Sequence, residues 1–329
     1  MNNEKLIEVK NISKHYKIRS QKIFRKSLIL KALEDISLDI YKGETLGIVG
    51  ESGCGKSTMG KSITKIIETD KGSIIYKGQD ITNKKNNELI DFRNEIQAVF
   101  QDPYSSLNPM LSIRESLEEP LVKNNKLTKA EINDIIHETI IKVGMTKEAL
   151  IKYPHEFSGG QRQRICIARA ISTTPEFILC DEPISALDVS IQAQIINMLE
   201  ELQVDYKLTY LFIAHDLSMV RHISHRIGVM YLGSLVEIGK SNDVYNEPLH
   251  PYTKGLLSSI LLPDPRLRTS GRLPTIEGDL PNILGDYKGC KFASRCKYKM
   301  KKCEENKPHL KDVGNDHSVA CFLYKKIPV

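Results

Sequence analysis

Gly50-Glu51-Ser52-Gly53-Cys54-Gly55-Lys56-Ser57-Thr58 is the stretch that decides the fold, because it fits the pattern G-x-x-x-x-G-K-[ST]. A short apolar run, residues 45–49, precedes it, and a helical pattern over residues 59–66 follows it. The glycines let successive N–H groups point at phosphate oxygens, and the start of the helix adds its positive dipole. We expect Lys56 to bridge the β- and γ-phosphates and Ser57 to offer its hydroxyl to Mg²⁺. The stretch, called the phosphate loop below, therefore predicts a nucleoside triphosphate site between a strand and a helix.

Composition indicates a folded protein whose longest apolar runs are too short to span a bilayer. The chain has 329 residues, a net charge of +6 and 40% hydrophobic residues, which excludes disorder and a small secreted scaffold. The runs at residues 46–49, 210–214 and 256–262 fall far short of the roughly 18 apolar residues that a membrane helix needs. The amino end lacks the pattern of a signal peptide. We therefore expect a cytoplasmic location with reduced thiols, and the small, dispersed charge surplus gives no reason to expect nucleic acid as a partner.

The order of hydrophobic patterns predicts an α/β fold. Residues 6–12 and 33–40 alternate as half-buried strands do, and residues 129–143 recur at helical spacing. Residues 177–180 and 210–214 are typical of buried strands on either side of a helix. That helix carries an apolar stripe of Ile191, Ile195, Met198, Leu199 and Leu202. We therefore expect a parallel sheet covered on both faces, followed after residue 246 by a proline-rich linker or an irregular tail.

One stretch between His15 and Glu34 is basic and contains no acid. Its charges are Lys17, Arg19, Lys22, Arg25, Lys26 and Lys31, and Lys14 comes just before it. Such a segment either faces lipid head groups or is a solvated hairpin between two strands, and charge runs favour the hairpin.

The strand at residues 177–180 runs into two acids, Asp181 and Glu182. Coupled to a phosphate loop, Asp181 can hold Mg²⁺ through its water shell, and Glu182 can polarise the water that attacks the γ-phosphorus. Alone, an Asp-Glu pair would be weak support for this chemistry.

Further motifs resemble those of one family. Ser158-Gly159-Gly160-Gln161, followed by RQRICIARA, closely resembles the signature of ABC-type ATPases. Gln101 is similar to the family's Q-loop residue, Ser185-Ala186-Leu187-Asp188 to its D-loop and His215 to its switch histidine. The resemblance, in family order over nearly the whole chain, implies an ABC-type P-loop ATPase with a mixed sheet core, residues 1–246. It further implies a helical signature subdomain at about residues 102–172 and a small irregular tail at residues 247–329.

The signature also has a physical interpretation. Ser158, Gly159 and Gly160 are expected to leave N–H groups bare at the start of a helix, which makes an anion site without a lysine. The resemblance implies that this site meets ATP held by another subunit, so that two ATP molecules lie in a head-to-tail dimer. It also implies that Tyr16 stacks on adenine, that Gln101 senses Mg²⁺ and the γ-phosphate beside a membrane partner, and that His215 holds the γ-phosphate.

Two stretches resemble the ATPases of oligopeptide and dipeptide importers, a group that includes nickel importers. They are residues 100–109, FQDPYSSLNP, and residues 250–253, HPYT. This resemblance implies a paralogous ATPase partner, two integral membrane permease subunits, an extracellular binding protein reached through them, and a peripheral place on the cytoplasmic face of the membrane. Ile184 and Cys166 depart from the group, which commonly has threonine and glycine there. Rival interpretations are a nickel-chelate importer, a soluble ABC ATPase acting on nucleic acid or ribosomes, and a redox-sensing module.

Four of the seven cysteines crowd near the end of the chain, at Cys290, Cys296, Cys303 and Cys321. Metal binding would organise a tail with little apolar material. The spacing lacks paired C-x-x-C knuckles, which favours a [4Fe-4S] cluster over zinc, with His309 and His317 as reserve ligands. The alternative is that these cysteines are small buried residues.

Overall fold

The computed structural model describes residues 4–18, 28–122, 127–258 and 287–324. The chain folds as two compact units. Unit 1 comprises Met1–Glu4, Tyr41–Thr45 and Asn83–Ile213, and unit 2 comprises Lys5–Ile40, Leu46–Thr82 and Ala214–Val329. Residues 19–27 of the expected basic hairpin, and the prolines expected between residues 259 and 286, lie outside the described residues.

Unit 1 is a short parallel sheet with a group of helices. Its strands are β6 (Ile96–Val99), β7 (Phe177–Asp181) and β8 (Thr209–Ile213), and β7 pairs in parallel with both neighbours. Its helices are α2 (Ile90–Glu95), α3 (Pro103–Ser106), α4 (Ile113–Val122), α5 (Lys129–Lys142), α6 (Gly159–Ile171) and α7 (Val189–Tyr206). Every residue of β7 and β8 is buried, as their apolar sequences predict.

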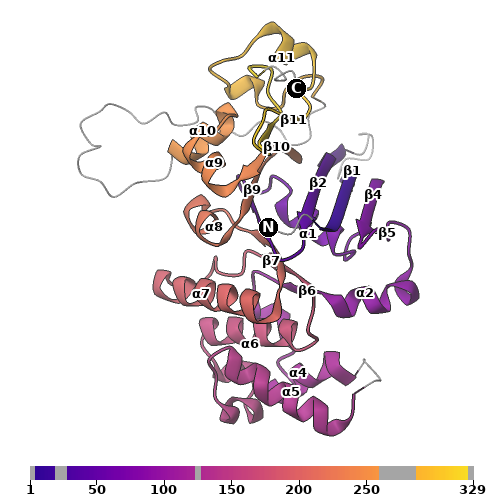
Figure 1. The fold of residues 1–329 in the computed structure, drawn as a ribbon, viewed down its shortest axis with the longest axis vertical. Helices are drawn as coiled ribbons and strands as arrows, with labels where there is room; N and C mark the ends of the chain where they lie inside the picture. The colour runs from indigo at the N-terminus through magenta and orange to yellow at the C-terminus, as the bar shows by residue number, and fades with distance from the viewer. Residues whose placement is uncertain (1–3, 19–27, 123–126, 259–286, 325–329) are drawn as a thin grey trace, which may run out of the picture. The chain divides into compact units, whose positions relative to one another are not determined.

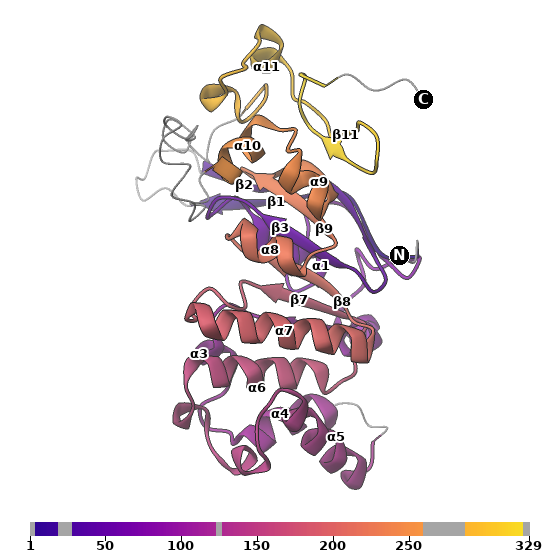
Figure 2. The ribbon, with the colours of Figure 1, turned by 60° about the vertical axis from the view of Figure 1, so that its left-hand side comes forward.

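The helices of unit 1 form where the sequence supplies both an apolar stripe and caps. α5 starts with a capping box, in which Thr128 Oγ1 accepts from Glu131 N and Glu131 Oε2 accepts from Thr128 N. α6 lies along α7 with α4 and α5 on its other side (Figure 2), and Arg164 of α6 donates to Gln194 Oε1 of α7 at 3.0 Å. The expected stripe of α7 is buried from Ile195 to Leu202, but Ile191 is only half-buried.

Unit 2 contains two sheets. One has the order β2-β1-β4-β5, visible side by side in Figure 1, and the other contains β11-β12-β10-β9-β3. Their strands are β1 (Lys5–Ile18), β2 (Leu28–Tyr41), β3 (Thr45–Val49), β4 (Lys71–Tyr76), β5 (Gln79–Asp80), β9 (Arg226–Tyr231), β10 (Ser234–Lys240), β11 (Lys311–Asp312) and β12 (Ser318–Val319). The helices are α1 (Lys56–Ile63), α8 (Leu217–Ile223), α9 (Ser241–Asn246), α10 (Pro251–Ser258) and α11 (Lys301–Glu305). β3 pairs in parallel with β9, whereas β9 and β10 are antiparallel, so this sheet is mixed.

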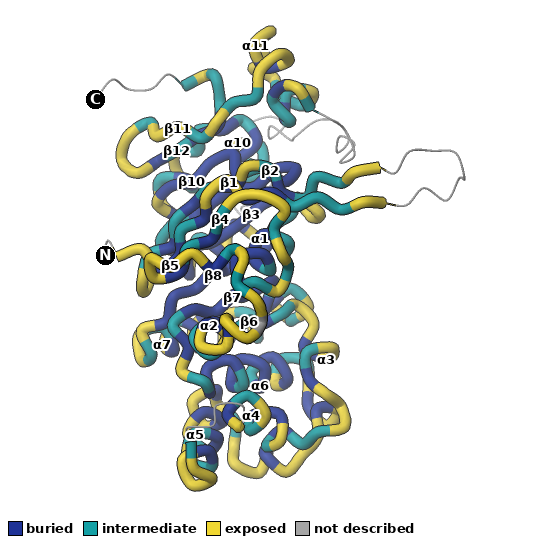
Figure 3. The backbone as a smooth tube through the Cα atoms, turned by 90° about the vertical axis from the view of Figure 1, so that its right-hand side faces the viewer, coloured by how far each residue is buried: buried dark blue, intermediate teal, exposed yellow. Residues whose placement is uncertain are grey.

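Two features of unit 2 differ from expectation. β1 and β2 are longer than the apolar patterns at residues 6–12 and 33–40, because the two strands are hydrogen-bonded neighbours and their pairing continues beyond the core. In Figure 3 these extensions change from dark blue to teal and yellow. The end of the chain is also not wholly irregular, since β12 pairs with β10 of the main sheet through Val319 opposite Glu237 and Ser318 opposite Ile238.

Candidate functional site

The phosphate loop lies in unit 2, between β3 and α1. All five residues of β3 are buried, which fixes the point where the loop begins. Gly55 has φ +104°, and a Cβ there would clash with the carbonyl oxygen of Ala32, so both the backbone conformation and the space require glycine. The first N–H groups of α1 precede its intrahelical bonds, as an anion site requires.

Lys56 is held against this loop rather than in solvent. Its side chain is buried, and Nζ donates to Gly50 O at 2.8 Å and to Glu51 O at 3.2 Å. Ser57 and Thr58 follow on the first turn of α1 and are half-buried. The loop thus offers a cation, a hydroxyl and backbone N–H groups together, which is the donor set that a triphosphate and its Mg²⁺ need.

His215 belongs to the same unit. It is exposed, directly after Ala214, whose N–H donates to Ile48 O of β3 at 3.2 Å. The backbone at His215 therefore lies beside the end of β3, where the phosphate loop starts. Tyr16 is half-buried on β1, and Lys14 Nζ lies 5.7 Å from its ring centroid.

The two acids lie in unit 1, as the end of β7. Asp181 is the last residue of the strand and is 4% exposed. Glu182 is half-buried and has φ +50°, a conformation that costs a non-glycine residue roughly 1–3 kcal/mol. Hydrogen bonds hold it there, from Glu182 N to Ile213 O at 2.9 Å and from Ser185 Oγ to Glu182 O at 3.1 Å. Strain of this kind is typical of functional positions.

The signature caps α6, and one detail of the expectation was wrong. Ser158 N donates to Gln161 Oε1 at 3.0 Å, and Ser158 Oγ accepts from Gln161 N at 3.4 Å, so the N–H of Ser158 is not bare. Gly159 and Gly160 remain before the first intrahelical bond, from Arg162 N to Ser158 O. A Cβ on Gly160 would lie 2.7 Å from Ile191 Cγ2, so glycine is needed there for close packing on α7.

The structure connects α3, which follows Gln101, to the signature helix α6 through two arginines that the sequence does not indicate. Gln101 is exposed between β6 and α3. The guanidinium of Arg162 lies 3.7 Å from the ring centroid of Tyr104, and Arg169 Nη1 donates to Ser106 O at 2.7 Å. Asp188, expected in the D-loop, is exposed and precedes α7. The only signal for these arginines was their place in the stretch RQRICIARA, which did not indicate a partner.

The four clustered cysteines line one pocket in the tail, together with apolar residues such as Phe292 and Met300. Burial raises the pKa of the Cys290 thiol to about 11 and also raises the pKa values of Cys296 and Cys321, so these thiols are protonated at neutral pH. In the described part of the chain, no group of three or more His, Cys, Asp or Glu residues has an arrangement that could hold a metal ion. The donor chemistry fits a cluster, but the geometry does not.

The histidines proposed as reserve ligands have other surroundings. His317 Nε2 lies 2.8 Å from Glu237 Oε1, so His317 pairs with this buried carboxylate. His309 is exposed.

Comparison with known proteins gives matches over nearly the whole chain. Residues 33–185 match the family described as ABC transporter, and residues 236–303 match the family described as Oligopeptide/dipeptide transporter, C-terminal region. The fold is similar to solved structures of the ATP-binding cassette MJ0796 in its dimeric, post-hydrolysis state with ADP and Pi. The TM-score is 0.64 at 29% identity, covering 71% of this chain and 98% of that one. With the phosphate loop and signature, these matches define an ATP-hydrolysing subunit of the ABC transporter class.

The curated relatives define the group within that class. The chain is 48% identical to the oligopeptide transport ATP-binding protein AppF of Bacillus subtilis, over 98% of both chains. It is 45% identical to OppF of Haemophilus influenzae over 98% of both chains, and 43% identical to OppF of Escherichia coli over 96% of both. This chain belongs to the family of oligopeptide and dipeptide transport ATP-binding proteins.

Proposed function

We propose that this chain uses ATP to drive the import of peptides through a membrane ABC transporter. The observation that carries the proposal is the full-length similarity to oligopeptide transport ATP-binding proteins, which includes the C-terminal region as well as the ATPase motifs. A nickel chelate is the alternative cargo. Action on nucleic acid or ribosomes is the less favoured one, because the relatives named above are transport proteins.

The site residues have distinct proposed roles. Lys56 and the phosphate-loop N–H groups bind the phosphates, while Ser57, Asp181 and Gln101 would hold Mg²⁺, which would neutralise phosphate charge during hydrolysis. Glu182 orients and deprotonates the attacking water, and His215 contacts the γ-phosphate. Tyr16 stacks on the adenine.

The signature is proposed to act on a second subunit's ATP. The start of α6 offers N–H groups without a lysine, and the related cassette MJ0796 is described as dimeric. The partner in this chain's case is proposed to be a paralogous ATPase, with Asp188 at the contact. Two permease subunits would bind near Gln101, and an extracellular binding protein would deliver cargo to them. The ATPase would therefore sit peripherally on the cytoplasmic face of the membrane, and none of the helices traced in the structure is long and apolar enough to span a bilayer.

Two proposals concern the tail. Residues 247–329 are proposed as a separate C-terminal region after the ATPase domain of residues 1–246. The four-cysteine pocket is proposed as the binding place of a [4Fe-4S] cluster, because four thiols line it, but the thiols would have to rearrange on binding, since in this structure they are not arranged to hold a metal ion. Anaerobically purified protein should then be brown and contain iron, whereas colourless protein without iron would refute the cluster.

The test of the main proposal is a transport assay on the reconstituted complex. Glu182→Gln should abolish ATP hydrolysis and peptide uptake while ATP binding persists, and Lys56→Ala should abolish ATP binding itself. Glu176→Gln, a half-buried acid of the same unit just before β7, is the matched control and should keep both activities. Normal ATP hydrolysis by Glu182→Gln would refute the assignment of Glu182 as the general base. ATP-driven uptake of nickel chelate but not of peptide would refute peptide as the cargo.

A further inference from the structure

The tail contacts the phosphate loop directly, at its second residue. Arg295 Nη1 lies 3.2 Å and 3.1 Å from the two carboxylate oxygens of Glu51, and the Arg295 side chain is only 8% exposed. Tyr252 Oη accepts a hydrogen bond from Glu51 N at 2.9 Å, and Tyr252 is fully buried. Both the backbone and the side chain of Glu51 are therefore held by residues that follow the ATPase motifs in the sequence.

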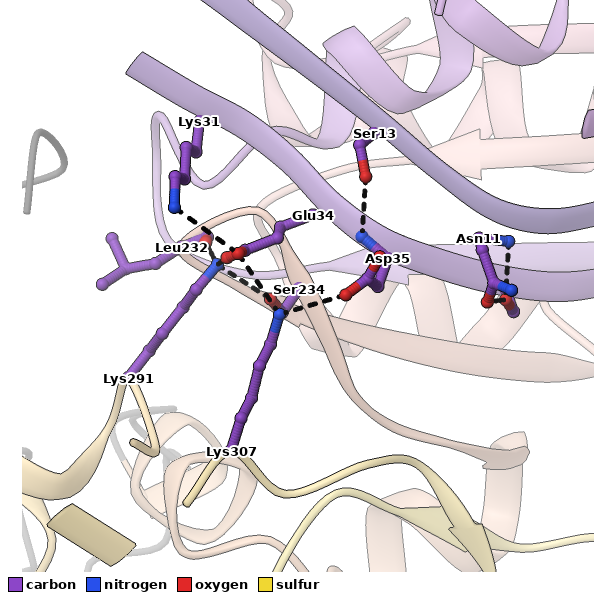
Figure 4. A network of polar contacts seen from close by, with 10 residues as sticks. Asn11, Ser13, Lys31, Glu34, Asp35, Leu232, Ser234, Lys291 and Lys307 are labelled. Atoms are coloured by element: carbon purple, nitrogen blue, oxygen red, sulfur yellow. Dashed lines mark hydrogen bonds and ion pairs between the residues drawn. The ribbon is translucent and has the colours of Figure 1, made fainter. Parts of the chain in front are cut away.

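A second contact supports the other end of the loop. Figure 4 shows Lys291 reaching from the tail to β2 and to the turn between β9 and β10. Lys291 Nζ lies 2.9 Å from Glu34 Oε2 and donates to Leu232 O at 2.6 Å and to Ser234 Oγ at 2.9 Å. Lys307 adds ion pairs at 3.4 Å to Glu34 and to Asp35. Lys291, whose side chain is 9% exposed, thus connects two segments that are far apart in the sequence.

These two segments, β2 and the turn between β9 and β10, lie against the phosphate loop. Gly233, in the turn, donates its N–H to Cys54 O at 2.8 Å and accepts from Glu34 N at 2.8 Å. Ala32, two residues before Glu34, is the residue whose carbonyl oxygen would clash with a side chain at Gly55. The position of these two segments therefore determines the shape of the phosphate loop from Cys54 to Gly55.

An aromatic cluster links the two contacts. The ring centroids of Tyr231 and Tyr252 are 4.6 Å apart, and Phe292 lies 5.3 Å from Tyr231 and 5.6 Å from Tyr252. Phe292 follows Lys291 in the sequence and is 4% exposed. The tail cations are therefore carried by a packed segment and not by a loose surface loop.

We propose that Arg295 and Lys291 are positioning residues for ATP binding, which hold the phosphate loop in its phosphate-binding shape. A glycine-rich loop that must order itself on binding loses affinity, and preorganisation by fixed neighbours recovers it. The inference rests on the ATP-hydrolysing function of the chain, and it assigns to the tail the setting of ATP affinity, separate from the hydrolysis step.

The test compares kinetic constants in the complete reconstituted transporter. Arg295→Met and Lys291→Met should each raise the KM for ATP about tenfold, the change expected from losing one buried charged hydrogen bond that shapes the loop, with kcat within about twofold. Arg295→Lys should recover part of the loss, because it restores the charge without the planar fork. Lys299→Met is the control, since Lys299 is an exposed tail lysine paired with Glu304, and its KM should not change.

A merely structural role predicts a different pattern. Unchanged KM in the Met variants, with melting temperatures near the wild type, would overturn the proposal, and so would a fall in kcat at constant KM. If Arg295→Met does not fold, the same criteria apply to Lys291→Met and Arg295→Lys, with ATP affinity measured by equilibrium dialysis. Loss of hydrolysis in the wild-type complex would instead count against the proposed function, so the two failures are distinguishable.

Discussion

Replacing Glu237 with leucine should destabilise the protein by about 4 kcal/mol, because this carboxylate joins three segments of unit 2. Glu237 lies on β10 with no exposed surface. It accepts hydrogen bonds from Leu249 N and His250 N, both at 2.8 Å, and His317 Nε2 of the tail also lies 2.8 Å away. Each hydrogen bond to a charged group contributes roughly 1.5–3 kcal/mol, and two backbone N–H groups would lose their acceptor at once. Glu237→Gln keeps one carbonyl oxygen and should cost about 2 kcal/mol.

The assay is thermal unfolding of the full chain, followed by circular dichroism. One kcal/mol corresponds to roughly 2–4 °C for domains of 150–250 residues, so Glu237→Leu should lower the melting temperature by about 8–16 °C and Glu237→Gln by about half of that. Asp316→Asn is the control, because Asp316 is an exposed tail residue beside His317 with only a 3.8 Å ion pair, and it should melt with the wild type. A melting temperature of Glu237→Leu within about 1 °C of the wild type would refute the reasoning.

Three further predictions concern the loop, the signature and acid stability. Gly55→Ala should weaken ATP binding at least about tenfold, measured by equilibrium dialysis, since the clash is with the backbone of Ala32; wild-type affinity would contradict this. Gly160→Ala should lower the unfolding free energy, measured in urea, by about 1–3 kcal/mol. Adding Ile191→Ala to the same chain should restore part of the lost stability, because it removes the methyl group 2.7 Å away. No recovery in the double variant would show that the packing argument is wrong. Burial opposes ionisation of Glu34, but the hydrogen bond and charge of Lys291, with Lys307 and Lys31, lower its pKa to about 2. Because the pKa of Glu34 is lowered, its ionised form stabilises the protein above about pH 4.5, and this stabilisation is lost as the pH falls towards 2. The loss of unfolding free energy caused by Glu34→Gln, measured in urea, should therefore shrink by about 1–2 kcal/mol between pH 6 and pH 2, after discounting for partial exposure and for the burial of Lys291. The same loss at both pH values would exclude this role.

The elements nearest the phosphate loop could be predicted from the sequence because local and tertiary signals agree there. The apolar run at residues 45–49 has the same bounds as β3, and the helical pattern from residue 129 begins where the Thr128 cap begins α5. Asp181 was expected at a strand end and is the last residue of β7. In each case a single stretch of sequence contains the strand or helix and the residues that end it.

The contacts of the tail could not be predicted, because their partners are far apart in the sequence. Nothing local indicates that Lys291 pairs with Glu34, or that two residues of β12 pair with β10. In the sequence, residues 250–253 carry only a family resemblance, whereas the structure gives them contacts: His250 N donates to Glu237 and Tyr252 Oη accepts from Glu51 N. The apolar pattern underestimates the lengths of β1 and β2 for a related reason, since strand pairing extends both strands past that pattern.

The pairing of β3 with β9 also bears on how the protein is made. Val49 lies opposite Val229, so β3 leaves the ribosome about 180 residues before this partner strand exists. At roughly 5–20 residues per second, that delay is about 10–35 s, during which a strand that is fully buried in the folded protein is exposed to solvent without this partner. Because such edges are prone to aggregate, cells producing this chain should need a holding chaperone during its translation, and slowing translation should lower the soluble yield.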